Sequence, residues 1–344
     1  MRIIVDGMGG DNAPQEIVKG AIEAARLIDH EIVLIGDEVA LSAELSANRY
    51  SAEDPKMGKI SVVHASEVIL GEDSPVKAVR TKKDSSMVRG IRMIKEGEGD
   101  LFISAGNTGA LMAASLFNLG RIPGIDRPAI ACIYPIMTQE PALLVDAGAN
   151  AECKASNLLE FGIMGSIYME RVLGRKNPRV GLVNNGTEEG KGTTLTKAAH
   201  EMLEKSSLIN FVGNVEAREV PHGVCDVIVC DGFVGNAILK LTEGFALAVL
   251  KLLKQKFTEG AKAKAGALLL KDKMYELKGE FDYSEYGGAP FLGVRGSVIK
   301  MHGSSNANAV KNTILKGIPY AENRVVETIE SAVLEIEEIV NSED

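Results

Sequence analysis

Residues 2–21 read RIIVDGMGGDNAPQEIVKGA, and this stretch decides the fold. Arg2–Asp6 is a short apolar run typical of a buried strand, and a glycine-rich turn follows it directly. Pro14 suits the first position of a helix, after which Ile17 and Ala21 recur at helical spacing. A strand, a tight turn and a helix in this order form the repeating unit of an α/β protein.

The same alternation continues along the chain. It predicts a helix over Ser85–Lys95 and a mainly parallel sheet with helices on both faces. No repeat and no Pro/Ser-rich linker divides the sequence, so residues 1–344 are expected to form a single domain. The further strands are expected at Glu31–Ile35, Ile60–His64, Asp100–Ser104, Ala129–Pro135, Ala142–Asp146, Arg179–Val183, Ile209–Val212 and Asp226–Cys230.

Composition excludes several classes of protein. Hydrophobic residues make up 45% of the 344 residues and tryptophan is absent, which predicts a large aliphatic core. A net charge of −9 argues against general nucleic-acid binding. An acid at position 6 with a glycine-rich turn after it is not expected in a signal peptide, and no apolar run is expected to reach the ~20 residues that span a bilayer. We therefore expect a cytoplasmic protein, with contact at a membrane surface left open.

Two basic islands interrupt the acidic background. Residues 77–95 hold seven Lys or Arg against one acid, and residues 251–278 hold eight Lys against three acids. Each island fits either an anionic partner or a solvated helix face. The four cysteines, Cys132, Cys153, Cys225 and Cys230, form no CxxC pair and are expected to be free thiols. With only five scattered histidines, no metal site is expected. No cofactor is expected either.

Five glycine-rich turns follow expected strands, at Asp6–Asn12, Ser104–Gly109, Asp146–Asn150, Asn184–Thr193 and Asp231–Asn236. Helix N-termini offer unpaired N–H groups and a positive dipole end, which bind phosphate. We expect the five turns to meet at one edge of the sheet, where ligands bind in α/β proteins. The candidate phosphate- or substrate-binding residues are Asp6, Gly7, Gly9, Gly10, Asp11, Asn107, Thr108, Glu188 and His302.

Two common phosphate-binding motifs are nearly matched, but neither is complete. The first turn departs from GxGxxG at Asn12, and the fourth departs from a Walker A loop at Asn185 and Gly192. Lys191 is either a phosphate-binding cation or a surface lysine, and Asn236 either caps a helix or polarises a carbonyl. No GxSxG and no HExxH motif is present, which favours chemistry in which bound phosphate is itself the nucleophile.

Taken together, the motifs resemble bacterial phosphate acyltransferase over nearly the whole chain. They are Asp6–Asp11, SAGNTGAL (104–111), DAGAN (146–150), NNGTEEGKG (184–192), DGFVGN (231–236), YGGAPFLGVRG (286–296) and HGSSNANA (302–309). Gly7 is a departure, since many members carry alanine there. The resemblance implies a three-layer α/β/α sandwich similar to isocitrate and isopropylmalate dehydrogenases and to phosphotransacetylases.

The resemblance also implies an activity. The family transfers a fatty acyl group from acyl-[acyl carrier protein] to inorganic phosphate, and the acyl phosphate enters phosphatidic acid and phospholipid synthesis. Lys191 would hold the phosphate and Asn236 would stabilise the oxyanion. The sequence does not identify the proton donor to the leaving thiolate: His302 is either that donor or a structural histidine. The implied partners are a second copy, the inner face of the cell membrane and an acyltransferase that consumes acyl phosphate. The alternatives are a phosphotransacetylase acting on acyl-CoA, a NAD-dependent decarboxylating dehydrogenase and a non-enzymatic membrane scaffold.

One segment, about 233–280, is expected to project as a helical hairpin. It alternates leucines with lysines, and the Ala/Gly-rich stretch 260–267 is expected to form the turn at its tip. This pattern fits a segment that lies on an anionic bilayer, a contact with the acidic carrier protein, or a dimer seam. The candidate contact residues are Lys254, Lys262, Lys264, Leu268, Leu269 and Leu270.

Overall fold

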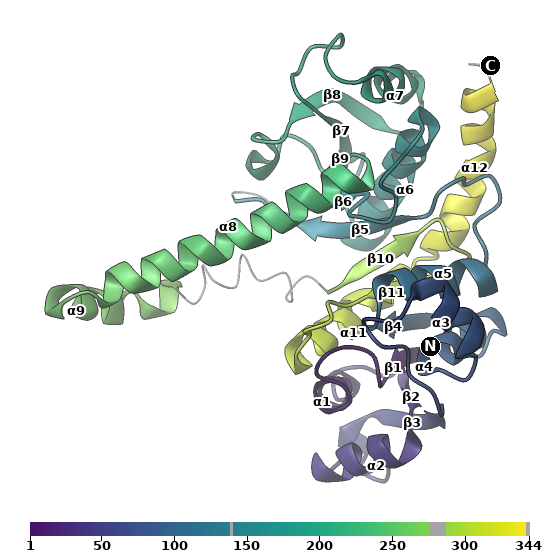
Figure 1. Ribbon diagram of the computed structural model, residues 1–344, viewed down its shortest axis with the longest axis vertical. Helices are drawn as coiled ribbons and strands as arrows, with labels where there is room; N and C mark the ends of the chain where they lie inside the picture. Colours follow the sequence, from purple (N-terminus) through teal and green to yellow (C-terminus); the bar gives the residue numbers. More distant parts are fainter. Residues whose placement is uncertain (138–139, 275–286, 342–344) are drawn as a thin grey trace.

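The first strand, β1 (Arg2–Asp6), is buried on both sides. Ile3 and Val5 belong to one hydrophobic cluster and Ile4 to another, because successive side chains of a strand point to opposite faces. Such a strand needs helices above and below it. The computed structural model describes residues 1–137, 140–274 and 287–341, and there an eleven-stranded sheet separates two helical layers (Figure 1). The predicted α/β/α sandwich with a mainly parallel sheet is confirmed.

The elements alternate along the chain as expected. The strands are β1, β2 (Glu31–Gly36), β3 (Lys59–His64), β4 (Leu101–Ser104), β5 (Ala129–Tyr134), β6 (Ala142–Val145), β7 (Arg179–Asn184), β8 (Asn210–Glu216), β9 (Val227–Val229), β10 (Ala289–Leu292) and β11 (Ser297–Lys300). The main helices are α1 (Gln15–Ala25), α2 (Glu38–Ala47), α3 (Pro75–Thr81), α4 (Ser86–Lys95), α5 (Thr108–Asn118), α6 (Ala155–Leu173), α7 (Thr194–Lys205), α8 (Gly232–Thr258), α9 (Ala261–Leu269), α11 (Ala307–Glu322) and α12 (Val325–Asn341).

Strand direction reverses across the middle of the sheet, whose order is β3-β2-β1-β4-β11-β10-β5-β6-β9-β7-β8. The first five strands are parallel to one another, and so are the last four. Between them, β10 and β5 pair antiparallel with each other and with their outer neighbours. The two parallel halves therefore run in opposite directions. The prediction that all five glycine-rich turns share one edge is wrong for this reason.

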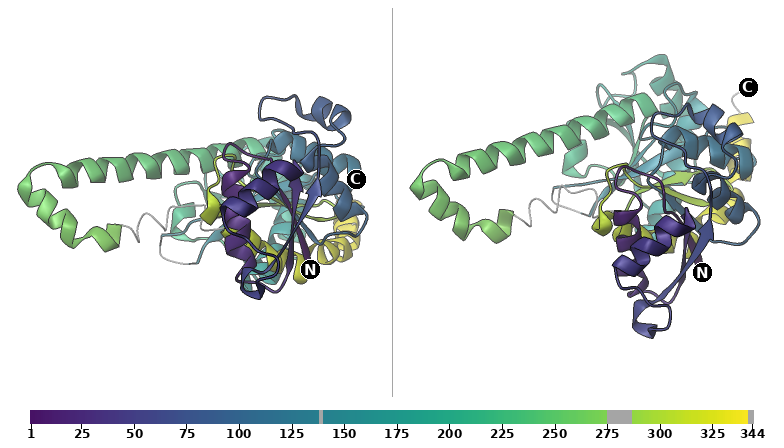
Figure 2. Two further views of the ribbon diagram at one scale, coloured as in Figure 1. Left: turned by 90° about the horizontal axis from the view of Figure 1, so that it is seen from below. Right: turned by 60° about the horizontal axis from the view of Figure 1, so that its bottom comes forward.

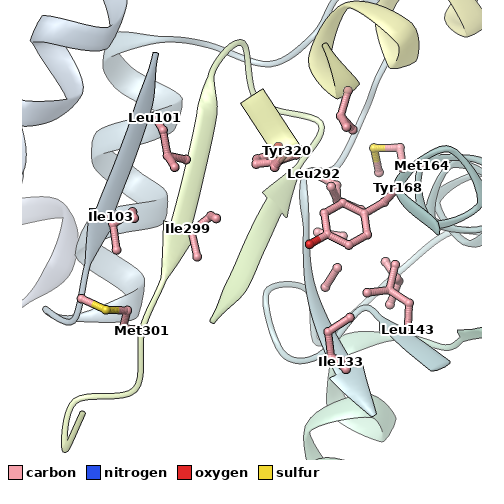
Figure 3. Packing of buried hydrophobic residues seen from close by; sticks show 14 of the residues in the cluster. Leu101, Ile103, Ile133, Leu143, Met164, Tyr168, Leu292, Ile299, Met301 and Tyr320 are labelled. Atoms are coloured by element: carbon pink, nitrogen blue, oxygen red, sulfur yellow. The ribbon is translucent and has the colours of Figure 1, made fainter. Parts of the chain in front are cut away.

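Helices cover both faces of the sheet. One cluster packs α1, α11, α6 and α7 against the sheet, and the other packs α3, α4, α5 and the start of α8. The first cluster crosses the reversal without a break, from Leu101 and Ile299 to Leu292 and Leu143 (Figure 3). At the crossing the hydroxyl of Tyr320 donates to the carbonyl of Phe291 at 2.9 Å. The two halves thus share one core, while the division of the chain into domains stays a prediction.

Two central strands, β10 and β11, are absent from the sequence-based prediction. Pro290 lies in β10 and has no N–H for a ladder, so its presence argued against a strand. The structure accommodates it because β10 is only four residues long and pairs with β11 through Ala289 and Pro290. β10 lies inside the motif YGGAPFLGVRG and β11 follows it directly, and no secondary structure was expected there from the sequence.

An arm made of α8 and α9 projects far from the sheet (Figures 1 and 2). Its turn lies at Glu259 and Gly260, and residues 261–269 are helical, so the prediction of a turn over 260–267 is wrong apart from its first residue. Residues 275–280 of the predicted hairpin lie outside the described residues. By length and composition alone, α8 is apolar enough to cross a membrane. Lys240, Glu243 and Lys251 interrupt its sequence, so this property of α8 concerns its mean composition and not an uninterrupted apolar run of ~20 residues.

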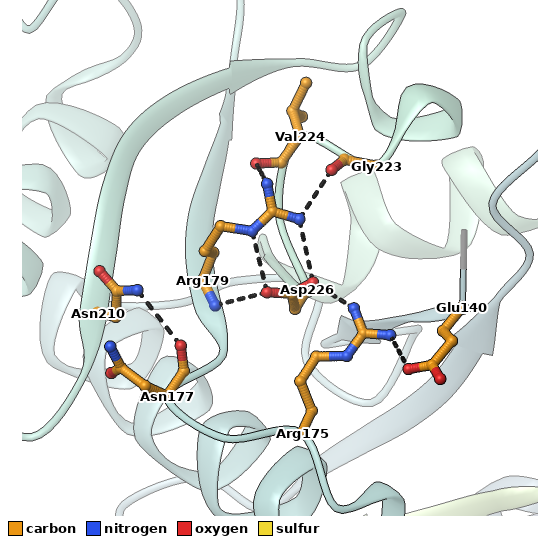
Figure 4. Close-up of polar contacts among 8 residues, drawn as sticks. All are labelled: Glu140, Arg175, Asn177, Arg179, Asn210, Gly223, Val224 and Asp226. Atoms are coloured by element: carbon orange, nitrogen blue, oxygen red, sulfur yellow. Dashed lines mark hydrogen bonds and ion pairs between the residues drawn. The ribbon is translucent and has the colours of Figure 1, made fainter. Parts of the chain in front are cut away.

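A buried carboxylate holds the second half together (Figure 4). Asp226, just before β9, accepts from the guanidinium groups of Arg175 at 2.5 Å and Arg179 at 3.1 Å. Arg179 also donates to the carbonyls of Gly223 and Val224. Burial alone would raise the pKa of Asp226, but the hydrogen bonds from both arginines hold it below its usual value. This network joins the start of β7 to the segment that leads into β9.

Candidate active site

A cavity of about 550 Å³ lies where the two halves meet. Its apolar wall includes Ile130 and Ile133 of β5 and Leu239 of α8. Its polar wall includes Thr108, Asn236 and the segment from Lys300 to Asn306. The volume suits a small-molecule site, and the mixed lining suits a ligand with a charged end and an apolar end.

The loop 302–306 is held by the first glycine-rich turn. The backbone N–H of Asp11 donates to the carbonyl of Gly303 at 2.8 Å, and the Asn12 amide donates to the carbonyls of Ser304 and Ser305. Gly10 has φ +100°, and a Cβ there would lie 2.9 Å from the Gly303 carbonyl oxygen. Protein atoms therefore already fill the space beside Gly10. This turn supports the cavity and does not line it.

The remaining candidates of the first turn are also structural in this arrangement. Asp6 is buried and accepts from the Ser104 hydroxyl at 2.7 Å and from the N–H of Met8. Burial raises the pKa of Asp6, and these hydrogen bonds oppose the increase. A Cβ on Gly9 would clash with Asp6, and one on Gly7 would clash with Leu41. The cavity is not lined by Asp6, Gly7, Gly9, Gly10 or Asp11.

Asp146 orders the loop between β6 and α6. Its carboxylate accepts from the N–H groups of Gly148, Ala149 and Asn150 at 2.7 to 3.1 Å. The first turns of α8 press on this loop, since a Cβ on Gly235 would collide with the Asp146 carbonyl oxygen. This close approach explains why the second glycine of the DGFVGN motif, Gly235, has no side chain.

Asn236 follows Gly235 and faces the same loop, and Gly148 is its neighbour in the cavity. Asp231 supplies the α8 cap, accepting from the N–H of Val234 at 2.9 Å, so Asn236 is not the capping residue. Within the described residues its side-chain amide has no hydrogen-bond partner, although it lines the cavity. The amide is therefore available to a ligand.

The Ser104–Gly109 turn contributes one residue to the cavity. Thr108 begins α5 and lines it. The Asn107 side chain is already used, because its oxygen caps α5 and its nitrogen donates to the carbonyls of Gly71 and Asp73. Asn107 is a structural residue in this arrangement.

His302 lines the cavity. The N–H of Ser304 donates to its Nδ1 at 3.2 Å, which places the proton of the neutral ring on Nε2. Burial lowers the pKa of His302, and Lys240 and Lys300 lower it further. A ring that is neutral at physiological pH is a hydrogen-bond donor and a poor proton source.

Lys191 and Glu188 are not among the lining residues. Both are exposed in the loop after β7, where the Lys191 N–H donates to the Glu188 carbonyl at 3.0 Å. Their catalytic roles stay predictions. The same region brings together Glu189, His200 and Glu204, whose potential metal-ligand atoms lie within 4.8 Å of one another. No spacing in the sequence had suggested this group, which does not line the cavity.

Lys300 and Cys132 line the cavity but were not singled out from the sequence as site residues. Lys300, at the end of β11, is 9% exposed, and its Nζ donates to the carbonyls of Ala105 and Met301. Cys132 lies in β5, and burial raises the pKa of its thiol to about 12. Such a thiol is not a nucleophile at neutral pH. A lysine two residues before the start of HGSSNANA was the signal that could have identified Lys300.

Known proteins resemble this chain in sequence and in fold. A family model described as fatty acid synthesis protein matches residues 1–328. The phosphate acyltransferase of Clostridioides difficile (strain 630) is 50% identical over 345 residues, covering 100% of both chains. A phosphotransacetylase from Streptococcus pyogenes superposes with a TM-score of 0.65 at 15% identity, covering 94% of each chain. A 4-hydroxythreonine-4-phosphate dehydrogenase from Klebsiella pneumoniae gives a TM-score of 0.53 at 13% identity, covering 93% of this chain and 99% of its own.

The fold is thus the α/β/α class shared by phosphotransacetylases and this type of dehydrogenase, with the cavity at the junction of the two halves. The chain belongs to the fatty acid synthesis protein family, and its curated relatives carry the name phosphate acyltransferase.

Proposed function

We propose that this protein is an acyltransferase that moves a fatty acyl group from the thioester of acyl carrier protein to inorganic phosphate. The observation that carries the proposal is the cavity, whose lining brings together the amide of Asn236, the start of α5 and apolar side chains such as Ile130 and Leu239. Helix N-termini favour an anion, and the apolar wall accommodates acyl carbons.

The reaction needs no covalent intermediate on the protein. A phosphate oxygen attacks the thioester carbonyl, and the tetrahedral intermediate collapses with cleavage of the carbon–sulfur bond. Hydrogen phosphate carries the proton that the leaving thiolate takes up, so the neutral His302 serves as a donor to oxygen rather than as the acid. The Asn236 amide donates to the oxyanion, an interaction that contributes ~3–4 kcal/mol in comparable sites.

Formation of free thiol from acyl carrier protein, dependent on phosphate, is the direct test. Asn236→Ala is expected to lower kcat by about 10²–10³ with an unchanged melting temperature, because its amide bonds to no described residue. Asn118, at the end of α5 and outside the cavity, provides the matched control. Equal turnover by Asn236→Ala and Asn118→Ala would contradict the assignment.

Activity with other substrates separates the rival functions. Faster turnover with acyl-CoA than with acyl carrier protein would indicate a phosphotransacetylase, and reduction of NAD by a hydroxy acid would indicate a dehydrogenase. Lys191→Ala tests the remaining prediction from the sequence. If phosphate-dependent release of thiol continues at the wild-type rate, Lys191 is a surface lysine, in agreement with its position outside the cavity.

The carrier protein is acidic in this proposal and needs a basic docking surface. Helix α3 packs on α5, with Pro75 against Gly109, which places the basic island 77–95 beside the Thr108 end of the cavity. Lys82 and Arg89 of this island already pair with acids, whereas Lys77 and Lys83 are exposed. Lys77→Glu with Lys83→Glu is expected to raise KM for the acyl carrier protein and to leave KM for phosphate unchanged.

We further propose that the arm mediates both dimerisation and membrane contact. Leu241, Phe245 and Leu252 lie on one face of α8 and are more than half exposed, so a second copy covers this face. At the tip, Leu268 and Leu269 are 74% and 87% exposed beside lysines, which fits an anionic bilayer. α8 is not a spanning helix in this proposal, because Lys240 and Glu243 line the cavity and Thr242 bonds to Tyr134 at 3.0 Å.

Serine substitutions on the exposed face of α8 and at the tip of the arm test dimerisation and membrane contact separately. Leu268→Ser with Leu269→Ser is expected to abolish sedimentation with anionic vesicles while the dimer persists. Leu241→Ser with Phe245→Ser is expected to give monomers. Monomers from the tip variant would reject the membrane assignment and identify the tip as part of the dimer seam.

A further inference from the structure

Lys300 occupies a central position in the sheet. It is the last residue of β11, where it pairs with Ser104 on one side and Ala289 on the other. β11 is the last strand before the direction of the sheet reverses, so Lys300 lies at the junction of the two halves. The residue is 9% exposed and lines the cavity.

The charge of Lys300 has no counterion in contact within the described part of the chain. Its Nζ donates to two neutral carbonyls, those of Ala105 at 3.2 Å and of Met301. Asp6 and Asp11 act on it only from farther away, and Asp6 already accepts from Ser104 and from the N–H of Met8. An ammonium group has three donors, so one N–H remains for a ligand.

A buried cation without a counterion is costly, and an anionic ligand in contact with it would offset that cost. Burial lowers the pKa of Lys300 to about 8, with Asp6 and Asp11 opposing the decrease. Lys300 is therefore still mostly protonated at neutral pH, and an anion in contact would raise its pKa again.

The surroundings of Lys300 favour the same kind of ligand. Thr108 is the first residue of α5, and Asn306 caps α11 by accepting from the N–H of Ala309 at 2.9 Å. Both residues line the cavity with Lys300. At the start of α11 the Ala307 N–H already donates to the Glu16 carboxylate at 2.7 Å, so the start of α5 is the helix N-terminus that favours an anion here. A helix N-terminus and a buried ammonium group together favour an oxyanion such as phosphate.

We propose that Lys300 is the cation that binds inorganic phosphate in the cavity, with the first turn of α5 completing the anion site. This assignment rests on the proposed acyl transfer for its role in turnover, and it gives Lys300 the task that sequence analysis gave to Lys191. The bound phosphate then faces the apolar wall of Ile130 and Leu239, along which the acyl chain enters.

Lys300→Met tests the proposal, because methionine has a similar length and removes the charge. Lys19→Met, an exposed position on α1, is the matched control. The first readout is the melting temperature with and without inorganic phosphate, in the absence of any acyl substrate. Wild type and Lys19→Met are expected to be stabilised by phosphate, and Lys300→Met is not. The second readout is KM for phosphate in the thiol-release assay, expected to rise at least tenfold in Lys300→Met.

Equal phosphate protection of Lys300→Met and wild type, or a KM for phosphate within twofold of wild type, would overturn the assignment. If Lys300→Met does not fold, Lys300→Gln removes the charge while keeping a polar donor for the carbonyl of Ala105 or Met301, and it is judged by the same two criteria. Failure of the proposed function is separable, since wild type would then bind phosphate without releasing thiol. Protection that depends on Lys300 in such an inactive protein would still establish the anion site.

Discussion

Replacing Lys300 by methionine is expected to change how the stability of the protein depends on pH. The pKa of Lys300 is lowered from 10.5 to about 8 in the folded protein because the ammonium group is buried. The folded state therefore loses this proton near pH 8, whereas the unfolded chain keeps it until about pH 10.5. Between these values the unfolded state binds more protons, so the free energy of unfolding of the wild type rises with pH.

The size of the effect follows from the pKa difference. At 1.36 kcal/mol for each unit, the contribution of Lys300 to the free energy of unfolding increases by about 3 kcal/mol between pH 7 and pH 10.5. Lys300→Met has no such group, so its stability relative to wild type should fall by this amount over the range. Only the change with pH is diagnostic, because the substitution also removes donors from the carbonyls of Ala105 and Met301.

Urea unfolding at intervals of half a pH unit, in buffer free of phosphate, measures this difference. Lys19→Met controls for the loss of an exposed lysine and should run parallel to wild type. A constant difference between Lys300→Met and wild type from pH 7 to pH 10.5 would refute the reasoning, because the ammonium group would then be solvated in the folded protein.

Three further substitutions test the framework of the cavity. Gly235→Ala places a methyl group against the Asp146 carbonyl oxygen and should destabilise the protein by ~1–3 kcal/mol in urea unfolding, whereas Gly244→Ala on the same helix meets nothing within 4 Å and should be neutral or stabilising. Gly10→Ala, at φ +100° and against Gly303, should lower both the melting temperature and the affinity for phosphate. If the affinity falls and the melting temperature does not change, the turn contacts phosphate directly, as the sequence predicted. Asp226→Asn should cost ~3–5 kcal/mol at pH 7, and because the folded pKa of Asp226 is lowered, the difference from wild type should shrink as pH falls below about 4; a difference that does not change with pH would show that the carboxylate charge is unimportant.

Much of the fold could be predicted from local pattern. The strands up to β9 have apolar runs bounded by turn residues, and their periodicity survives in the structure. β10 and β11 could not be found in this way, because each is four residues long and their neighbourhood is rich in glycine and contains Pro290. Missing these two strands concealed the reversal of direction. The glycine-rich turns were consequently assigned to one edge when they lie on two.

The site was predictable in part. Motif spacing identified Asn236, Thr108 and His302, and all three line the cavity. Asp6, Gly10 and Asn107 were assigned to the ligand because glycines and small polar residues after a strand are typical of phosphate loops. In the structure they contact other loops instead, a distinction that depends on contacts between residues about 30 to 290 positions apart. Lys300 was overlooked because what distinguishes it from other lysines is its burial, and no pattern in the surrounding sequence predicts that burial.

The length of α8 determines how far Asn236 moves when the tip of the arm is displaced. At 1.5 Å per residue its 27 residues extend about 40 Å, and Asn236 lies only about 6 Å along that axis from Gly232. If the helix tilts about its seat near Asp146, Asn236 moves roughly one-seventh as far as the tip. The arm would then act as a long lever with the amide of Asn236 close to its pivot. A displacement of the tip by several ångströms would shift this amide by less than about one.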